Sequence, residues 1–166
     1  MASRVEELVS KYDLTTHPEG GFYKEIYRSP ENALINGKSY SVSTNIYFLL
    51  RSFQYTGDFS AWHMVIDTDE AWHHLEGNDI EIFILNEAGH ISTHTLGKSA
   101  NAAHVVTVPK NVWFAAKIVD TDKDGFSLIS CTCSPGFDFS SFRLADRKHL
   151  LDKFPHQKEL ITDLSR

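Results

Sequence analysis

The chain has 166 residues and a formal net charge of −6 at pH 7, a size that suits a single domain over 1–166 with its own hydrophobic core. The acidic balance lacks the positive field that attracts nucleic acid, and the longest apolar run, Ile46 to Leu50, is too short to cross a membrane. Glu6 and Glu7 stand where a signal peptide needs apolar residues. We therefore expect a soluble cytoplasmic protein with neither nucleic-acid nor membrane partners.

The first expected element is a short amphipathic helix over Ser3 to Tyr12. Ser3 and Glu6 have the spacing of a capping box, which satisfies free amide groups at a helix start. The turn-forming stretch from Thr15 to Gly21 then ends the helical pattern. Apolar side chains recur along the segment at helical spacing, namely Val5, Leu8, Val9 and Tyr12.

From Phe22 to Cys133 the sequence consists of short runs of aromatic and β-branched residues between turn-forming residues. Their regular spacing without intervening helical segments predicts a sandwich or closed barrel of antiparallel strands. After Pro135-Gly136 the apolar spacing becomes helical again. The expected strands are Gly21–Arg28, Ser43–Arg51, Phe59–Ile66, Ala71–Glu76, Ile80–Asn86, Ile91–Leu96, His104–Val108, Phe114–Val119 and Phe126–Cys133.

The two cysteines of the chain, Cys131 and Cys133, alternate on the last of these strands. They share one face of the strand, about 6.6 Å apart along the chain. This arrangement suits neither a local disulfide nor, with no other cysteine, a thiolate zinc site. We expect two small buried residues of a core strand.

The most informative segment is Gly57–Gly77, GDFSAWHMVIDTDEAWHHLEG. On a β-hairpin that turns near 66–69, His63 and Glu70 would lie opposite or diagonal, within about 5 to 8 Å. An imidazole and a carboxylate would then face each other inside an apolar barrel. Trp72 shares the Glu70 face, where it either stacks on a ligand ring or packs in the core. The residues facing the other way, Trp62 and Met64, are expected to pack beneath a helix or between subunits.

The Gly, His, Glu and Gly of this segment follow the first cupin motif, which reads Gly, five residues, His-x-His, three or four residues, Glu, six residues, Gly. Val65 stands in place of the second His. Further blocks of resemblance are THPEGGFYKEIYRS, STNIYFLL, DEAWHHLEG, VPKNVWFAA and SPGFDFSSF. The chain is thus similar to the cupin superfamily, and within it to the uncharacterised family labelled cupin_5, a domain of unknown function. The resemblance implies an all-β jelly-roll antiparallel β-barrel with an internal ligand cavity, paired as a homodimer; the helical ends add short N- and C-terminal helices.

The second cupin motif, which ends Pro-x-Gly-x-x-His, maps onto Pro109 to Phe114, with Asn at the Gly position and Phe114 at the His position. Of the metal ligands that the resemblance implies, His63 and Glu70 remain, whereas tightly held zinc or iron needs three or four protein ligands. His74 is about 13 Å along the strand from Glu70, too far to replace a lost ligand. We therefore expect no metal cofactor; a divalent cation held by a reduced ligand set is the alternative.

Without a metal, His63 and Glu70 suit an acid–base pair that abstracts a proton next to a carbonyl. Metal-free cupin epimerases of nucleotide-linked keto-sugars, to which the chain is distantly similar, also use a Tyr acid. Tyr47 is the candidate here, and if it projects inward then Asn45 and Ser43 follow it into the cavity. Alternation alone leaves the opposite face open.

Other residues are expected to bind the ligand rather than react. They are Trp72, His74, Phe114 and Glu25, the last sharing a strand face with Tyr23 and Tyr27. Asp138 either closes the barrel mouth or caps a turn. The remaining histidines share no spacing and are expected at surface or loop positions, namely His17, His90, His94, His104, His149 and His156.

The sequence thus predicts a cytoplasmic cupin that binds a small polar or carbohydrate-like ligand inside its barrel. The leading hypothesis is a metal-independent epimerase or isomerase that uses His63, Glu70 and Tyr47. Two alternatives stay open: a small-molecule-binding module without chemistry, and a metal-dependent cupin enzyme with a reduced ligand set.

Overall fold

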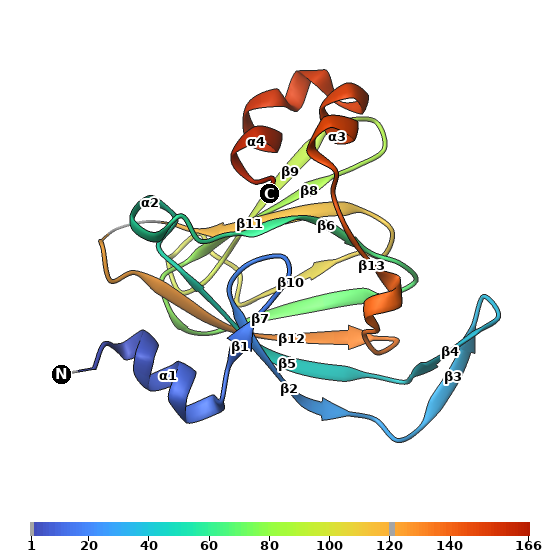
Figure 1. The fold of residues 1–166 in the computed structure, drawn as a ribbon, viewed down its shortest axis with the longest axis horizontal. Coiled ribbons are helices and arrows are strands. Elements are labelled where there is room, and N and C mark those ends of the chain that lie inside the picture. Colours follow the sequence, from blue (N-terminus) through green and yellow to red (C-terminus); the bar gives the residue numbers. More distant parts are fainter. Residues whose placement is uncertain (1, 120–121) are drawn as a thin grey trace.

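Two antiparallel β-sheets face each other in the computed structural model, which describes residues 2–119 and 122–166 (Figure 1). Within these ranges the larger sheet has the strand order β1-β2-β5-β12-β7-β10, and the smaller sheet has the order β13-β6-β11-β8-β9. Helices cover the outer face of each sheet, so that the barrel is the central layer of the molecule (Figure 1). This arrangement is the all-β jelly roll that the sequence predicts.

The elements have the following bounds. The larger sheet contains β1 (Thr15–Thr16), β2 (Phe22–Arg28), β5 (Thr44–Arg51), β7 (Asp69–Gly77), β10 (Val105–Val108) and β12 (Phe126–Ser134). The smaller sheet contains β6 (Ser60–Val65), β8 (Ile80–Leu85), β9 (Ile91–Leu96), β11 (Trp113–Ile118) and β13 (Phe142–Leu144). The strands β3 (Asn32–Ile35) and β4 (Lys38–Ser41) pair separately; the helices are α1 (Arg4–Tyr12), α2 (Phe53–Thr56), α3 (Arg147–Lys153) and α4 (Lys158–Asp163), with 3-10 turns at Phe139–Ser141 and Pro155–Gln157.

Every strand expected from the sequence is present, with ends that agree to within two residues. The short elements β1, β3, β4, β13 and α2 were not expected. Asn36 and Gly37 connect β3 and β4 with φ angles of 47° and 80°, the left-handed backbone that a tight hairpin turn requires. The resulting hairpin projects from the side of the barrel (Figure 1).

The N-terminal helix α1 begins at the predicted capping box. The Glu6 amide donates to Ser3 Oγ at 3.2 Å, and the Ser3 amide donates to Glu6 Oε2 at 2.8 Å. Leu8 from α1 packs with Leu49 and Leu128 on the outer face of the larger sheet. The expected helix is therefore confirmed, and it covers one side of the barrel.

The C-terminal helices α3 and α4 lie over the outer face of the smaller sheet (Figure 1). Trp62 of β6 is fully buried there with Leu150 and Ile161, and its indole N–H donates to the Leu160 carbonyl at 3.2 Å. Its expected position beneath a helix is confirmed. None of the helices in the described ranges is both long and apolar enough to cross a membrane.

The segment Gly57–Gly77 does not form the expected hairpin. Strand β6 pairs with β11 and β13 in the smaller sheet, whereas β7 pairs with β10 and β12 in the larger one. The turn between them bonds to other loops, because the Asp67 amide donates to Asn111 Oδ1 at 3.0 Å and the Ile66 amide donates to the Ser141 carbonyl at 2.9 Å. The chain thus crosses between sheets, and His63 and Glu70 come from opposite walls of the barrel.

Candidate functional site

A cavity of about 470 Å³ lies between the two sheets. Its wall is formed by the inward side chains of β2, β5, β6, β7 and β12, by the turn at 17–21 and by the loop after β12. The volume falls in the range typical of small-molecule sites. Its ionisable buried residues are His17, Glu19, His63, Glu70, Cys131 and Cys133.

His63, on β6, is 1% exposed, and its hydrogen bonds define its tautomer. Its Nδ1 lies 2.7 Å from the Ala61 carbonyl oxygen, which can only accept, so Nδ1 must carry the proton. The Nε2 atom of the neutral ring is then an acceptor. Burial lowers the pKa of His63 to about 3, so the neutral ring is the stable form near pH 7.

Glu19 supplies the partner of His63, and the sequence analysis missed it. Its Oε2 lies 3.1 Å from His63 Nε2, while its Oε1 accepts a hydrogen bond from Ser60 Oγ at 2.7 Å. Burial, together with the nearby charge of Glu70, raises the pKa of Glu19 well above its ordinary value. Because the neutral Nε2 atom can only accept, the Glu19 carboxyl carries the proton, and its O–H donates a hydrogen bond to His63 Nε2. We call these two side chains the Glu19–His63 pair.

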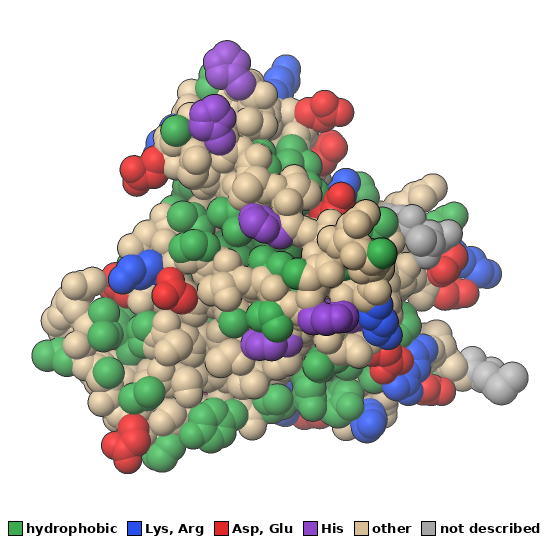
Figure 2. All heavy atoms as spheres, turned by 180° about the vertical axis from the view of Figure 1, so that it is seen from behind, with side chains coloured by type: hydrophobic (Ala, Val, Ile, Leu, Met, Phe, Trp, Pro, Cys, Tyr) green, Lys and Arg blue, Asp and Glu red, His purple; other side chains and the backbone are tan. Residues whose placement is uncertain are grey.

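His17 occupies a loop position, as expected, but its side chain is buried and lines the cavity. Its side chain is 6% exposed, and its Nδ1 accepts the Glu19 backbone N–H at 3.2 Å. Burial lowers its pKa to about 4, which keeps the ring neutral. The other histidines expected on the surface are exposed, namely His90, His94, His104, His149 and His156. Histidine side chains are visible on the outer face in Figure 2.

Glu70, on β7, lies on the wall opposite the Glu19–His63 pair and is 8% exposed. Burial raises its pKa to about 7, an effect partly opposed by its contact with the Cys131 thiol. Among the residues that the structure describes, no Lys or Arg forms an ion pair with Glu70. A carboxyl group with this pKa exchanges its proton readily near neutral pH.

Cys131 and Cys133 are free and buried, as expected, and both also face the cavity. Burial, followed by the charge of Glu70, raises the pKa of each thiol well above its ordinary value. They are therefore thiols rather than reactive thiolates near neutral pH. Trp72 completes this wall beside Glu70, and its indole, like the Cys131 thiol, opposes the rise in the Glu70 pKa.

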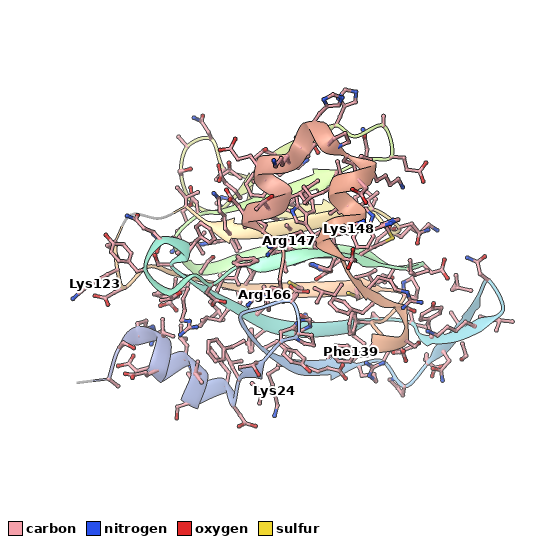
Figure 3. The ribbon with its side chains drawn as sticks, turned by 45° about the horizontal axis from the view of Figure 1, so that its top comes forward. Lys24, Lys123, Phe139, Arg147, Lys148 and Arg166 are labelled. Atoms are coloured by element: carbon pink, nitrogen blue, oxygen red, sulfur yellow. The ribbon has the colours of Figure 1, made fainter. Side chains whose placement is uncertain are left out.

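The charged residues of the cavity mouth include Arg28 and Glu25. Arg28 donates from Nε and Nη2 to the two carboxylate oxygens of Glu25, each at 2.8 Å, and from Nη2 to the Phe137 carbonyl at 2.9 Å. Lys24 and Phe139 lie on the same side of the barrel (Figure 3). Asp138 lines the cavity and caps the following 3-10 turn through the Ser140 amide at 2.8 Å, so the expected turn cap is confirmed.

A bulge in β2 changes which side chains reach this mouth. Its register against β5 shifts between Glu25 and Tyr27, so Arg28 pairs with Thr44 on the cavity side. Tyr27 instead pairs with Asn45 on the outer side and is 53% exposed. The expectation that Tyr27 shares a face with Tyr23 and Glu25 is therefore wrong.

Tyr47 and Asn45 lie on the outer face of β5, and Tyr47 is not placed to act on a ligand in the barrel. The inward residues of β5 are Thr44, Ile46 and Phe48. The Tyr47 ring packs on Tyr12 of α1 with 4.4 Å between ring centroids, and Asn45 Oδ1 accepts from Ser130 Oγ at 2.7 Å. Strand alternation is compatible with either face of β5 pointing inward, and in the structure the face without Tyr47 points inward. Ser43 is also not among the lining residues.

His74 and Phe114 also lie outside the cavity lining. His74 Nε2 contacts the Asn78 carbonyl at 3.1 Å, toward the end of β7 away from Glu70. Phe114 is a core residue whose ring centroid is 4.0 Å from that of His63. Phe114 thus packs against the His63 ring and is not among the residues that line the cavity.

The residues present do not fit a cupin metal centre. Both ring nitrogens of His63 are engaged, with the Ala61 carbonyl and Glu19, and apolar Val65 and Phe114 stand at two motif ligand positions. In the described part of the chain, no group of three His, Cys, Asp or Glu side chains is arranged to hold a metal ion. The second motif keeps its backbone shape nonetheless, because Asn111 adopts the left-handed φ of 61° that suits the Gly of that motif.

Comparison with known proteins agrees with this fold. Residues 6–145 match the family model described as "Cupin superfamily (DUF985)". The chain belongs to this cupin family. A solved protein from Shewanella oneidensis is 33% identical to this cupin, with a TM-score of 0.87 and coverage of 100% of this chain and 99% of that one.

Two further solved structures share the cupin fold. A hypothetical protein from Leishmania major is 24% identical, with a TM-score of 0.88 and 99% of each chain covered. KdgF from Halomonas sp. is 14% identical, with a TM-score of 0.52 over 79% of this chain and 94% of that one. The comparison with curated proteins found no match.

Proposed function

We propose that this cupin binds a small polar, carbohydrate-like ligand in its barrel and transfers a proton on it without a metal, as an epimerase or isomerase does. One observation carries the proposal: two buried acid–base groups, the Glu19–His63 pair and Glu70, line opposite walls of one cavity. A reaction that removes a proton at one position of a ligand and returns one at another needs two such groups.

Glu70 is the proposed base. Its carboxylate takes the proton from a carbon next to a ligand carbonyl, and the electron pair of the broken C–H bond moves onto the carbonyl oxygen. In a hydroxy-ketone, Glu19 protonates that oxygen to give an enediol. Glu70 then returns its proton to the former carbonyl carbon, while the hydroxyl group on the first carbon gives its proton to Glu19, so that the carbonyl group has moved to the first carbon. The raised pKa of Glu70, about 7, suits both the uptake and the return of a proton near neutral pH.

The chemistry of the cavity supports a ligand whose deeply bound part is polar but uncharged. Its innermost polar groups are the protonated Glu19 carboxyl, neutral imidazole and thiol groups, and Glu70, which ionises near neutral pH. Its lining cations, Lys24 and Arg28, are only partly buried side chains of β2. Ligand hydroxyl and carbonyl groups can pair with the innermost donors and acceptors. A deeply bound permanent anion would lack a buried cation among the described lining residues.

A binding module without chemistry is the second candidate. It is favoured by the fact that Glu19 and His63 satisfy each other, as buried polar groups commonly do.

We also propose that the protein is a cytoplasmic homodimer. The family resemblance supports the pairing of two chains, and light scattering tests it.

The deciding experiment is proton exchange on a panel of keto-sugars and hydroxy-ketones in deuterium oxide, followed by mass spectrometry. We expect the wild-type protein to incorporate deuterium next to the carbonyl of at least one compound, and Glu70→Gln, Glu19→Gln and His63→Ala to abolish incorporation. Tyr47→Phe is the matched control, because Tyr47 faces α1. Binding of a compound without exchange would favour the passive module, and exchange that survives Glu70→Gln would refute the proposed base.

A further inference from the structure

The turn that carries Glu19 is held from outside the cavity. The segment 17–21 closes on itself through hydrogen bonds from the His17 amide to the Gly21 carbonyl and from the Gly20 amide to the His17 carbonyl, each at 3.0 Å. Within this turn the Glu19 side chain enters the cavity and its backbone faces β6. The position of the carboxyl group therefore depends on what fixes this short piece of backbone.

Arg166 contacts that backbone directly. Its Nε donates to the Glu19 carbonyl at 3.2 Å, its Nη2 donates to the Phe59 carbonyl at 3.3 Å, and its guanidinium lies 4.5 Å from the centroid of the Phe59 ring. The Glu19 carbonyl also accepts the Ala61 amide at 2.8 Å. Figure 3 shows Arg166 beside the loop that leads into β2. One side chain thus ties the Glu19 turn to the start of β6.

Asp58 provides the second half of this clamp. It is a buried residue whose Oδ1 accepts the Gly21 amide at 3.0 Å and lies 3.9 Å from Arg166 Nη2. Its Oδ2 accepts from the backbone and side chain of Arg51, at 3.2 and 3.3 Å. The carboxylate is therefore fixed between two guanidinium groups while it holds the end of the turn.

The fit between the turn and this clamp is close. A Cβ atom at Gly20, whose φ is 117°, would lie 2.0 Å from the Phe59 carbonyl oxygen and 2.5 Å from Arg166 Nη2. Only glycine fits there. Because the Glu19 carboxyl must meet His63 Nε2 at 3.1 Å, a small displacement of the turn would separate the two groups.

We propose that Arg166 is a positioning residue, which acts with Asp58 to hold the turn at 17–21 so that the Glu19 carboxyl stays opposite His63. Arg166 is not among the residues that line the main cavity, so it acts through the backbone of Glu19. Its positive charge also opposes the burial and the Glu70 charge that raise the pKa of Glu19. The catalytic consequence rests on the proposed function, whereas the clamp itself does not.

The test compares Arg166→Gln and Arg166→Lys with a matched control, Arg147→Gln. Arg147 Nη2 donates to the Ser165 carbonyl at 2.9 Å, so the control loosens the same end of the chain without touching Glu19. Two readouts apply to the full-length protein: the titration midpoint of the Glu19 carboxyl by ¹³C NMR, and the hydrogen-exchange rate of the Ala61 amide, which donates to Glu19.

Arg166→Gln should raise the Glu19 midpoint and accelerate Ala61 exchange at least about tenfold by opening the local hydrogen bond. Arg166→Lys should bring the midpoint back toward that of the wild type, because it restores the positive charge, and Arg147→Gln should change neither readout. Unchanged readouts in Arg166→Gln would overturn the clamp, as would equal changes in Arg147→Gln. If Arg166→Gln does not fold, Ala61 exchange in Arg166→Lys decides: a rate equal to that of the wild type overturns the clamp.

Where a substrate is available, Arg166→Gln should lower kcat about 10²-fold, the size of effect that a displacement near 1 Å produces. An active wild-type enzyme whose Arg166→Gln variant keeps full kcat would refute the positioning role. If the wild-type protein is inactive but Arg166→Gln still shows the NMR changes, the result would refute the proposed reaction and support the clamp.

Discussion

Replacing Glu70 by Gln should change how the stability of the fold depends on pH. Glu70 is buried in the cavity wall, and its folded-state pKa is raised from 4.5 to about 7. The folded protein therefore binds one more proton than the unfolded chain between these two values. Its contribution to stability is fully present below pH 4.5 and is lost as the pH rises through about 7. A glutamine at this position has no proton to lose, so the variant lacks this pH dependence.

The size of the effect follows from the two pKa values. At about 1.4 kcal/mol per pH unit, a rise from 4.5 to about 7 corresponds to a loss of about 3 kcal/mol between pH 4.5 and pH 8. Solvent screens this effect little because the carboxyl group is buried. The stability of Glu70→Gln relative to the wild type should therefore improve by about 3 kcal/mol over this interval.

Urea unfolding followed by tryptophan fluorescence at pH 4.5 and pH 8 measures this difference. The buried histidines contribute equally to both proteins, so their titrations cancel in the comparison. Removing the Glu70 charge also relieves part of the rise in the Glu19 pKa, which changes the comparison in the same direction. An exposed control, Glu87→Gln, should follow the wild-type profile. Parallel profiles for Glu70→Gln and the wild type would refute the reasoning, since they would mean that Glu70 ionises in the folded protein as it does in water.

Three further predictions concern the surroundings of the site. Trp62→Ala should lower the free energy of unfolding by about 3 to 5 kcal/mol in urea titrations, because the ring is fully buried beneath α3 and α4; a change below about 1 kcal/mol would contradict that packing. Tyr47→Phe should leave ligand binding by calorimetry unchanged, since the hydroxyl is outside the cavity; a tenfold loss would return Tyr47 to the site. The double variant Val65→His with Phe114→His should not retain stoichiometric zinc after gel filtration, because Ala61 and Glu19 already engage His63; one tightly held zinc per chain would contradict this.

Local signals in the sequence were sufficient to predict the strands of a sandwich or closed barrel, and the cupin resemblance implied the jelly-roll barrel. Alternating apolar residues and turn-forming breaks placed each long strand to within two residues, and the capping box placed the start of α1. Spacing of the cupin motif identified His63 and Glu70, and both line the cavity. These features depend on neighbouring residues, which a sequence displays directly.

What the sequence could not provide was the pairing of distant segments. Glu19 and His63 are far apart in the sequence. Their side chains meet only because the turn at 17–21 packs on β6. The signal available was the His-Pro-Glu-Gly-Gly run, whose two glycines mark a tight turn; both have positive φ angles, of 117° and 70°. That run belongs to a block of family resemblance, but alone it does not indicate which strand the Glu contacts.

Strand alternation gave wrong inward faces where the sequence did not show which of the two faces of a strand points into the barrel. The bulge at Ile26 turned Tyr27 outward and Arg28 inward, and the inward face of β5 was the one without Tyr47. The turn after β6 looked like a hairpin but crosses between sheets, because its amides bond to Asn111 and Ser141. A shift of one residue reverses every inward assignment on a strand.

The state of the His63 ring provides the most direct test of the Glu19–His63 pair. Nitrogen-15 NMR of the ring, recorded from pH 8 to pH 4, distinguishes the neutral tautomers from the imidazolium. With a pKa of about 3, His63 should remain neutral throughout, with its proton on Nδ1 and a hydrogen-bonded Nε2. An imidazolium at pH 7, or a neutral ring with its proton on Nε2, would contradict a Glu19 carboxyl that donates to His63.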